Sequence, residues 1–163
     1  MSDRPDLAFG PITPADASAI AAWVPTPADV IRFAGPEMAF PFSQEAFLAG
    51  ASDSWWIFVL RDRGRLVATG SFGTKGEGEA RIGRVLVDPA CRGKGYGRSV
   101  MEHLIARAFD LPEIDRISLG VYENNMSART LYEDLGFVDA GGRRTDDVEG
   151  EPWIGMRLVL ARP

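Results

Sequence analysis

The segment Val85–Arg98 constrains the fold and function of this 163-residue chain more than any other. Its apolar start, Val85–Val87, leads into Asp88-Pro89, where a strand should end because proline cannot donate a ladder hydrogen bond. Three glycines follow at positions 93, 95 and 97, and an amphipathic helical pattern begins directly after them. A strand, a glycine-rich loop and a helix N-terminus in this order can hold phosphate, because the backbone approaches closely and the first helical N–H groups point at the anion.

The spacing of this loop excludes two common phosphate-binding motifs. A P-loop requires Lys followed by Ser or Thr, but Lys94 is followed by Gly95. A dinucleotide-binding fingerprint requires a third glycine where this chain has Arg98 or Val100. The pattern that remains, Arg-x-x-Gly-x-Gly preceded by Val-x-Asp-Pro, resembles the acyl-CoA pyrophosphate loop of the GNAT (GCN5-related N-acetyltransferase) family. Taken alone, the segment could still be a simple connection between strand and helix.

A second motif further along the chain favours the family reading. Asn125-x-x-Ala128-x-x-Leu131-Tyr132-x-x-x-Gly136-Phe137 resembles the second signature of the same family, at the usual distance after the glycine loop. The two motifs cover about residues 80 to 140. The resemblance implies acetyl-CoA as the acyl donor. The residues it implies for acetyl-CoA binding are Leu86, Val87, Arg92, Gly93, Lys94, Gly95, Tyr96, Gly97, Arg98, Asn125 and Ala128.

The order of apolar patterns predicts one α/β (α+β) domain spanning residues 1–163. Strands are expected at 7–12, 55–60, 66–72, 80–87, 116–121, 137–140 and 153–160, the last two joined by an acidic, Gly-containing turn. Helices are expected at 15–23, 28–33, 43–49, 97–108 and from a cap at Asn125 to 135. These elements predict a mixed, mostly antiparallel sheet of about seven strands flanked by helices on both faces, the acyl-CoA N-acyltransferase fold that the resemblance implies.

Composition narrows the classes of partner. The net charge of −5 and the absence of a basic stripe argue against nucleic acid as a partner. One cysteine and one histidine cannot build a disulfide framework or a multi-imidazole metal site, so no metal is expected. The polar, proline-rich start and the lack of a long apolar run predict a cytoplasmic protein without membrane contact. Family members are often monomers or dimers, so a monomer or homodimer is expected.

Acyl transfer to an amine requires a polarised carbonyl, a neutral amine and a protonated leaving group. The resemblance implies that backbone N–H groups near Leu86 and Val87 polarise the carbonyl, and that Tyr132 protonates the departing thiolate. Tyr132 also lies on the apolar stripe of its predicted helix and could simply pack there. Cys91 is not expected to carry the acyl group, since the family transfers it directly.

The general base is not fixed by the resemblance. Members resembling the ribosomal-protein alanine acetyltransferase carry a glutamate where this chain has Gly120, and members resembling histone acetyltransferases carry one where it has Arg81. Glu79 and Glu37 are candidates, each with a simple exposed carboxylate as the alternative. Water, or an amine already deprotonated, could dispense with a base.

The predicted activity is an acetyl-CoA-dependent N-acetyltransferase that acetylates a primary amine, of a small molecule in the preferred reading. Aromatic residues dense in the first part of the chain suggest an aromatic-walled acceptor pocket, with Glu37 or Asp29 at its edge, suited to a cationic amine. These residues are Trp23, Phe33, Phe40, Phe42, Trp55 and Trp56, and core packing is the alternative for each. The alternatives are a non-catalytic acyl-CoA-binding module and an enzyme acetylating a protein N-terminus or lysine, with a peptide amine as acceptor.

Overall fold

The computed structural model describes residues 5–51 and 54–163. Its centre is a seven-stranded sheet in the order β1-β2-β3-β4-β5-β7-β6, in which only β4 and β5 run parallel. The strands are β1 (Leu7–Pro11), β2 (Trp55–Asp62), β3 (Arg65–Gly76), β4 (Glu79–Val87), β5 (Arg116–Tyr122), β6 (Val138–Val148) and β7 (Glu151–Ala161). The helices are α1 (Pro14–Ala21), α2 (Pro27–Ala34), α3 (Gln44–Leu48), α4 (Tyr96–Phe109) and α5 (Met126–Asp134), with a 3₁₀ turn at Pro89–Cys91. The predicted fold class is confirmed.

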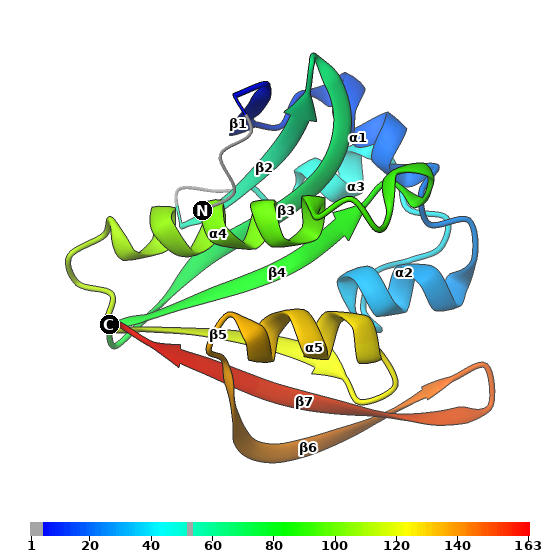
Figure 1. Ribbon diagram of the computed structural model, residues 1–163. Helices are drawn as coiled ribbons and strands as arrows, with labels where there is room; N and C mark the ends of the chain where they lie inside the picture. Colours follow the sequence, from blue (N-terminus) through cyan, green and yellow to red (C-terminus); the bar gives the residue numbers. More distant parts are fainter. Residues whose placement is uncertain (1–4, 52–53) are drawn as a thin grey trace.

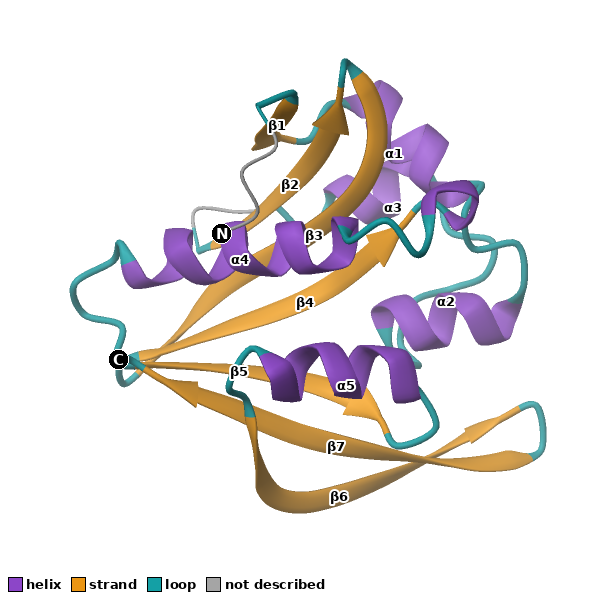
Figure 2. Ribbon diagram, viewed as in Figure 1, coloured by secondary structure: helices purple, strands orange, loops and turns teal. Residues whose placement is uncertain are grey.

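Helices cover both faces of the sheet (Figures 1 and 2). The face covered by α4 and α5, here named the α4/α5 face, has a core that includes Ile82 of β4, Leu104 of α4 and Tyr132 of α5. The opposite face, here named the α1–α3 face, packs α1, α2 and α3 around Phe33, Phe47 and the strand β2. Thr13, Thr26 and Ser43 cap these three short helices, each accepting a backbone N–H in the first turn.

The strands β4 and β5 separate halfway along their length (Figure 1). They pair only from Glu79↔Arg116 to Ile82↔Leu119, although β4 continues to Val87 and β5 to Tyr122. The separation begins next to a bulge in β4, where Gly83 and Leu86 face Ser71 and Thr69 of β3. Arg84 within this bulge has a φ of 53°. A non-glycine residue in this left-handed region is uncommon and often marks a functional site.

The C-terminal hairpin is longer than predicted. The acidic segment expected to be a turn is paired: Arg143↔Met156 through Val148↔Glu151 extends β6 and β7 to 11 residues each. Only Glu149-Gly150 forms the turn, with φ values of 54° and 86°. A two-residue turn in which both φ values are positive matches the right-handed twist of the flanking strands. The turn is therefore compact, although the strand residues leading into it are acidic.

Candidate active site

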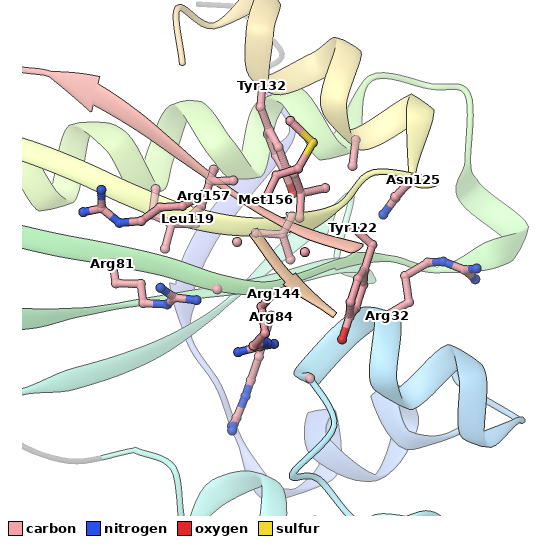
Figure 3. Close-up of a pocket in the computed structure, with 18 of the residues that line it drawn as sticks. Arg32, Arg81, Arg84, Leu119, Tyr122, Asn125, Tyr132, Arg144, Met156 and Arg157 are labelled. Carbon is pink, nitrogen blue, oxygen red and sulfur yellow. The ribbon is translucent and has the colours of Figure 1, made fainter. Parts of the chain in front are cut away.

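A cavity of about 580 Å³ lies where β4 and β5 separate. Its lining comes from α2, β2, β4, β5, α5, β6 and β7 (Figure 3). The missing ladder between the two strands leaves a slot through the sheet. Both faces of the molecule therefore contribute side chains to one pocket.

Strand alternation decides which side chain enters the cavity from which face. Leu119, Val121 and Met156 pack into the core of the α4/α5 face. The intervening residues Gly120 and Tyr122 therefore face the α1–α3 side, where Tyr122 packs with Trp153 and α2. Figure 3 shows Tyr132 and Asn125 on one side of the strands, and Arg81, Arg84, Arg144 and the Tyr122 hydroxyl on the other.

The glycine loop meets the N-terminus of α4 beside this slot. Gly95 is the N-cap residue of α4, with a φ of 83° and no side-chain cap, so no side chain occupies the first helical N–H groups. Gly93 also has a positive φ of 78°, and nothing lies within 4 Å of where its Cβ would stand. Arg92, Lys94 and Arg98 are exposed around the loop. An exposed, uncapped helix end with cations beside it fits a pyrophosphate.

Two of the residues predicted to bind the cofactor, Tyr96 and Gly97, offer no side chain to the loop. The side chain of Tyr96 is buried and its hydroxyl donates to Asp62, so only its N–H group at the helix start faces the loop. Gly97 packs closely below Leu131 and Val87, with 3.5 and 3.6 Å from the position of a Cβ to their side chains.

Val87 is the better placed of the two residues predicted to polarise the carbonyl. The N–H of Asp88 donates to Val67 of β3 at 2.8 Å. Since N–H groups alternate in direction along a strand, the N–H of Val87 points away from β3, towards the slot, and that of Leu86 points towards β3.

The helix α5 brings Asn125, Ala128 and Tyr132 to the cavity. Asn125 occupies the N-cap position of α5 as predicted, but its side chain makes no capping hydrogen bond. Tyr132 is buried beside Phe137, and burial raises the pKa of its hydroxyl to about 12. Its proton is therefore retained at any physiological pH.

The structure places both candidate bases outside the cavity lining. Glu79 accepts hydrogen bonds from Ser118 and from Arg157, whose Nη2 lies 3.1 Å from each carboxylate oxygen. Burial raises the pKa of Glu79, but these hydrogen bonds lower it more, leaving a weak base. Glu37 lies exposed after α2 and does not line the cavity. Among the cavity-lining residues that the structure describes there is no Asp, Glu or His.

The expected aromatic wall is largely absent. Phe33 and Trp55 line the cavity, whereas Trp23, Phe42 and Trp56 pack into the two cores and Phe40 is 43% exposed. Asp29 is also outside the lining and pairs with Arg32 at 3.8 Å. The polar lining consists instead of tyrosines, Asn125 and six arginines, at 32, 81, 84, 143, 144 and 157. Sequence reasoning missed five of these arginines because they come from four separate elements and form no local motif.

Arg81 and Gly120, the two positions where the resembled enzymes carry a glutamate, lie against each other. A Cβ on Gly120 would stand 3.0 Å from Nη2 of Arg81. The guanidinium group therefore fills the space above Gly120. The site carries a positive charge at the positions where the resembled enzymes carry a glutamate.

Comparisons with known proteins agree with this geometry. The model of the acetyltransferase (GNAT) family matches residues 23–137. The [ribosomal protein bS18]-alanine N-acetyltransferase of Escherichia coli (strain K12) is 32% identical over 106 residues, covering 65% of this chain and 70% of that protein. A crystal structure of the ribosomal-protein-S18-alanine N-acetyltransferase from Escherichia coli has a TM-score of 0.74 at 25% identity, covering 95% of this chain and 93% of the other.

Spermidine N-acetyltransferase from Vibrio cholerae, solved in complex with CoA and spermine, has a TM-score of 0.79. It is 19% identical, covering 97% of this chain and 96% of the other, and so shares the fold. Because the family model spans most of the chain and agrees with both motifs, the chain belongs to the acetyltransferase (GNAT) family of N-acyltransferases.

Proposed function

We propose that the protein transfers the acetyl group of acetyl-CoA to a primary amine of a small molecule, by direct attack of the amine on the thioester. The observation that carries this proposal is the cavity through the sheet. Tyr132 and Asn125 lie on its α4/α5 side, and the arginine-lined part of the same cavity, here named the polar chamber, lies on the α1–α3 side (Figure 3). A thioester placed in the slot is open to an amine arriving from the opposite face.

Acetyl-CoA is held from the α4/α5 side. The pyrophosphate sits on the N–H groups at the start of α4, with Arg92, Lys94 and Arg98 around it. Asn125 and Ala128 border the path of the pantetheine arm, and Asn125 is available for it because its side chain does not cap α5.

In the chemical step, the amine nitrogen bonds to the thioester carbon and the carbon–sulfur bond breaks. The N–H of Val87 stabilises the charge that develops on the carbonyl oxygen. Tyr132 hydrogen-bonds the departing thiolate and donates a proton to it, and water returns a proton to the tyrosine, whose raised pKa favours the protonated form. The amine gives up its proton to water, because no carboxylate or imidazole among the described residues lines the cavity. Guanidinium groups nearby lower the pKa of a bound ammonium group and so favour the reactive neutral amine.

The test is a panel of primary amines incubated with the protein and acetyl-CoA, in which free thiol is followed over time. Amine-dependent thiol release, with an N-acetylated product identified by mass spectrometry, is the expected result. Tight binding of acetyl-CoA by calorimetry without turnover of any amine would instead indicate a non-catalytic acyl-CoA-binding module.

A protein amine is the second candidate acceptor, and the similarity to the [ribosomal protein bS18]-alanine N-acetyltransferase favours it. A synthetic peptide with a free N-terminal alanine belongs in the same panel. A kcat/KM for this peptide well above that of every small amine would make the second candidate the better one.

A further inference from the structure

Four arginines line the cavity on the α1–α3 face. They are Arg81 and Arg84 of β4, Arg144 of β6 and Arg157 of β7. Arg157 is directly opposite Gly120 in the ladder between β5 and β7, and Arg144 is opposite Gly155. A Cβ on Gly120 would stand 3.0 Å from Nη2 of Arg81, and one on Gly155 would stand 4.0 Å from Cβ of Arg144, so both glycines leave room for these side chains.

Ion pairs within the protein account for two of these four charges. Arg157 pairs with Glu79 at 3.1 Å, and Arg144 pairs with Asp146 at 3.0 Å. Within the described residues, Arg81 and Arg84 have no carboxylate within 4.0 Å. Among the described residues, these two guanidinium groups therefore have no ion pair of their own. Glu79 acts on Arg81 only from a greater distance and already pairs with Arg116 and Arg157.

Arg84 is held in place although this is costly. Its Nη1 atom is buried without a hydrogen-bond partner, and its backbone adopts the left-handed φ of 53°. A Cβ on Gly50 would stand 2.8 Å from the same nitrogen, so the guanidinium group lies directly against Gly50. Burial lowers the pKa of Arg84. For Arg81, burial lowers the pKa and the charges of Arg144 and Arg157 act in the same direction, while the charge of Glu79 opposes them without reversing the shift. A guanidinium nitrogen that is buried without a hydrogen-bond partner, as Nη1 of the half-buried Arg84 is among the described residues, is unfavourable until an anion reaches it.

The geometry points to an acceptor that is a small primary amine carrying an oxyanion group, a carboxylate or a phosphate, bound by Arg84 and Arg81. This inference rests on the proposed function and specifies its substrate class. The fork of a guanidinium matches the two oxygens of such a group. With the anion held there, the amine reaches the slot between β4 and β5. Diamines and polyamines are disfavoured, because a second ammonium group would face like charges without a carboxylate in the lining.

The experiment compares matched acceptors that differ in charge. The pairs are L-alanine with L-alaninamide, and 2-aminoethyl phosphate with ethanolamine; 1,4-diaminobutane is the dication. We expect the anionic member of at least one pair to have a kcat/KM about tenfold or more above that of its neutral partner, and the diamine to be the poorest acceptor. The pair that shows the preference distinguishes a carboxylate from a phosphate as the recognised group.

Two substitutions connect the preference to the proposed residues. Arg84→Gln and Arg81→Gln should lower kcat/KM for the anionic acceptor by about 10- to 100-fold, the scale of charged hydrogen bonds. The kcat/KM for the neutral partner should fall much less, because it loses only the effect of the guanidinium groups on the amine, and the affinity for acetyl-CoA should stay near the parental value. Arg63→Gln is the matched control, because Arg63 also has a left-handed φ, of 51°, but lies exposed in the turn between β2 and β3.

The inference is overturned if neutral or dicationic amines are preferred, or if Arg84→Gln lowers kcat/KM equally for anionic and neutral acceptors. If no amine is acetylated, calorimetry on the CoA-saturated protein still decides. Binding of L-alanine or 2-aminoethyl phosphate that Arg84→Gln abolishes would support the anion site while the proposed function fails. Lack of binding by both would overturn the site.

Discussion

Tyr132 shows how one side chain can serve packing and chemistry at once. Its ring belongs to the core of the α4/α5 face, whereas the residue also lines the cavity. Tyr132→Phe should keep the ring and change stability little, but should lower kcat by about 10²–10³ through loss of the proton donor. Acetyl-CoA affinity should stay near the parental value. Steady-state kinetics and calorimetry measure both.

The raised pKa of Tyr132 adds a pH signature. Because burial raises the pKa to about 12, the hydroxyl stays protonated, and its ionisation should not limit kcat below pH 10. Parental turnover in Tyr132→Phe would leave the tyrosine with a packing role alone.

Gly95 tests the phosphate site at the level of a single residue. Gly95→Asp should abolish acetyl-CoA binding in a calorimetric titration, because a carboxylate at the start of α4 repels the anion that the helix end attracts. Gly64→Asp is the matched control. Gly64 has nearly the same φ, 82° against 83°, but lies in the turn between β2 and β3, so it reports backbone strain without touching the loop. Equal affinity for acetyl-CoA in both variants would show that the phosphate does not bind at this helix end.

The element α1 is joined to β2 by a buried carboxylate. Asp16 accepts hydrogen bonds from the N–H of Thr13 at 3.0 Å and from Arg61 at 2.6 Å. Burial raises the pKa of Asp16, but these hydrogen bonds lower it more, so the pKa lies below its ordinary value of 3.8. Asp16→Asn should reduce the free energy of unfolding at pH 7 by about 1–3 kcal/mol.

The pH dependence of this loss has a definite sign. Since the folded-state pKa is the lower one, the carboxylate stabilises the fold fully above about pH 4, and the contribution is lost as the pH falls through the folded-state pKa. Chemical denaturation of the parent and Asp16→Asn should therefore converge at acidic pH. Asp29→Asn, the corresponding residue of α2 with its weaker pairing to Arg32 at 3.8 Å, should cost less at pH 7. A loss independent of pH would contradict the role of the charge.

Elements whose signals are local were predictable from the sequence. The glycine loop before α4 and the apolar stripe of α5 depend on residues a few positions apart. The hairpin β6–β7 was predicted too short, because another element supports its far end: Tyr122 of β5 donates to Asp146 and packs with Val148 and Trp153. Propensity alone cannot show such partners.

At the scale of the whole molecule, the acceptor chamber could not be predicted, because its charges meet only after folding. From its position in the sequence, Glu79 is a plausible base. In the folded protein, however, it is held by Arg157 of β7 and Ser118 of β5. Arg81 belongs to no recognisable sequence motif. It lies next to Gly120 only because β4 pairs in parallel with β5. The residues proposed to bind the cofactor belong to two local sequence motifs. The residues proposed to bind the acceptor come from separate strands and meet only in the folded sheet.

This division of the molecule into two faces also predicts the order of events. If acetyl-CoA enters from the α4/α5 face and the amine from the α1–α3 face, both can be bound together, and initial rates should give intersecting lines in double-reciprocal plots. A double-displacement route would need a nucleophile in the cavity. Cys91 is buried in the 3₁₀ turn before the glycine loop, 3.8 Å from Asp88, and does not line the cavity. Cys91→Ala should therefore keep the parental kcat, and mass spectrometry should find no acetylated protein after incubation with acetyl-CoA alone. Parallel lines, together with an acetyl group on Cys91, would replace direct attack with a covalent route.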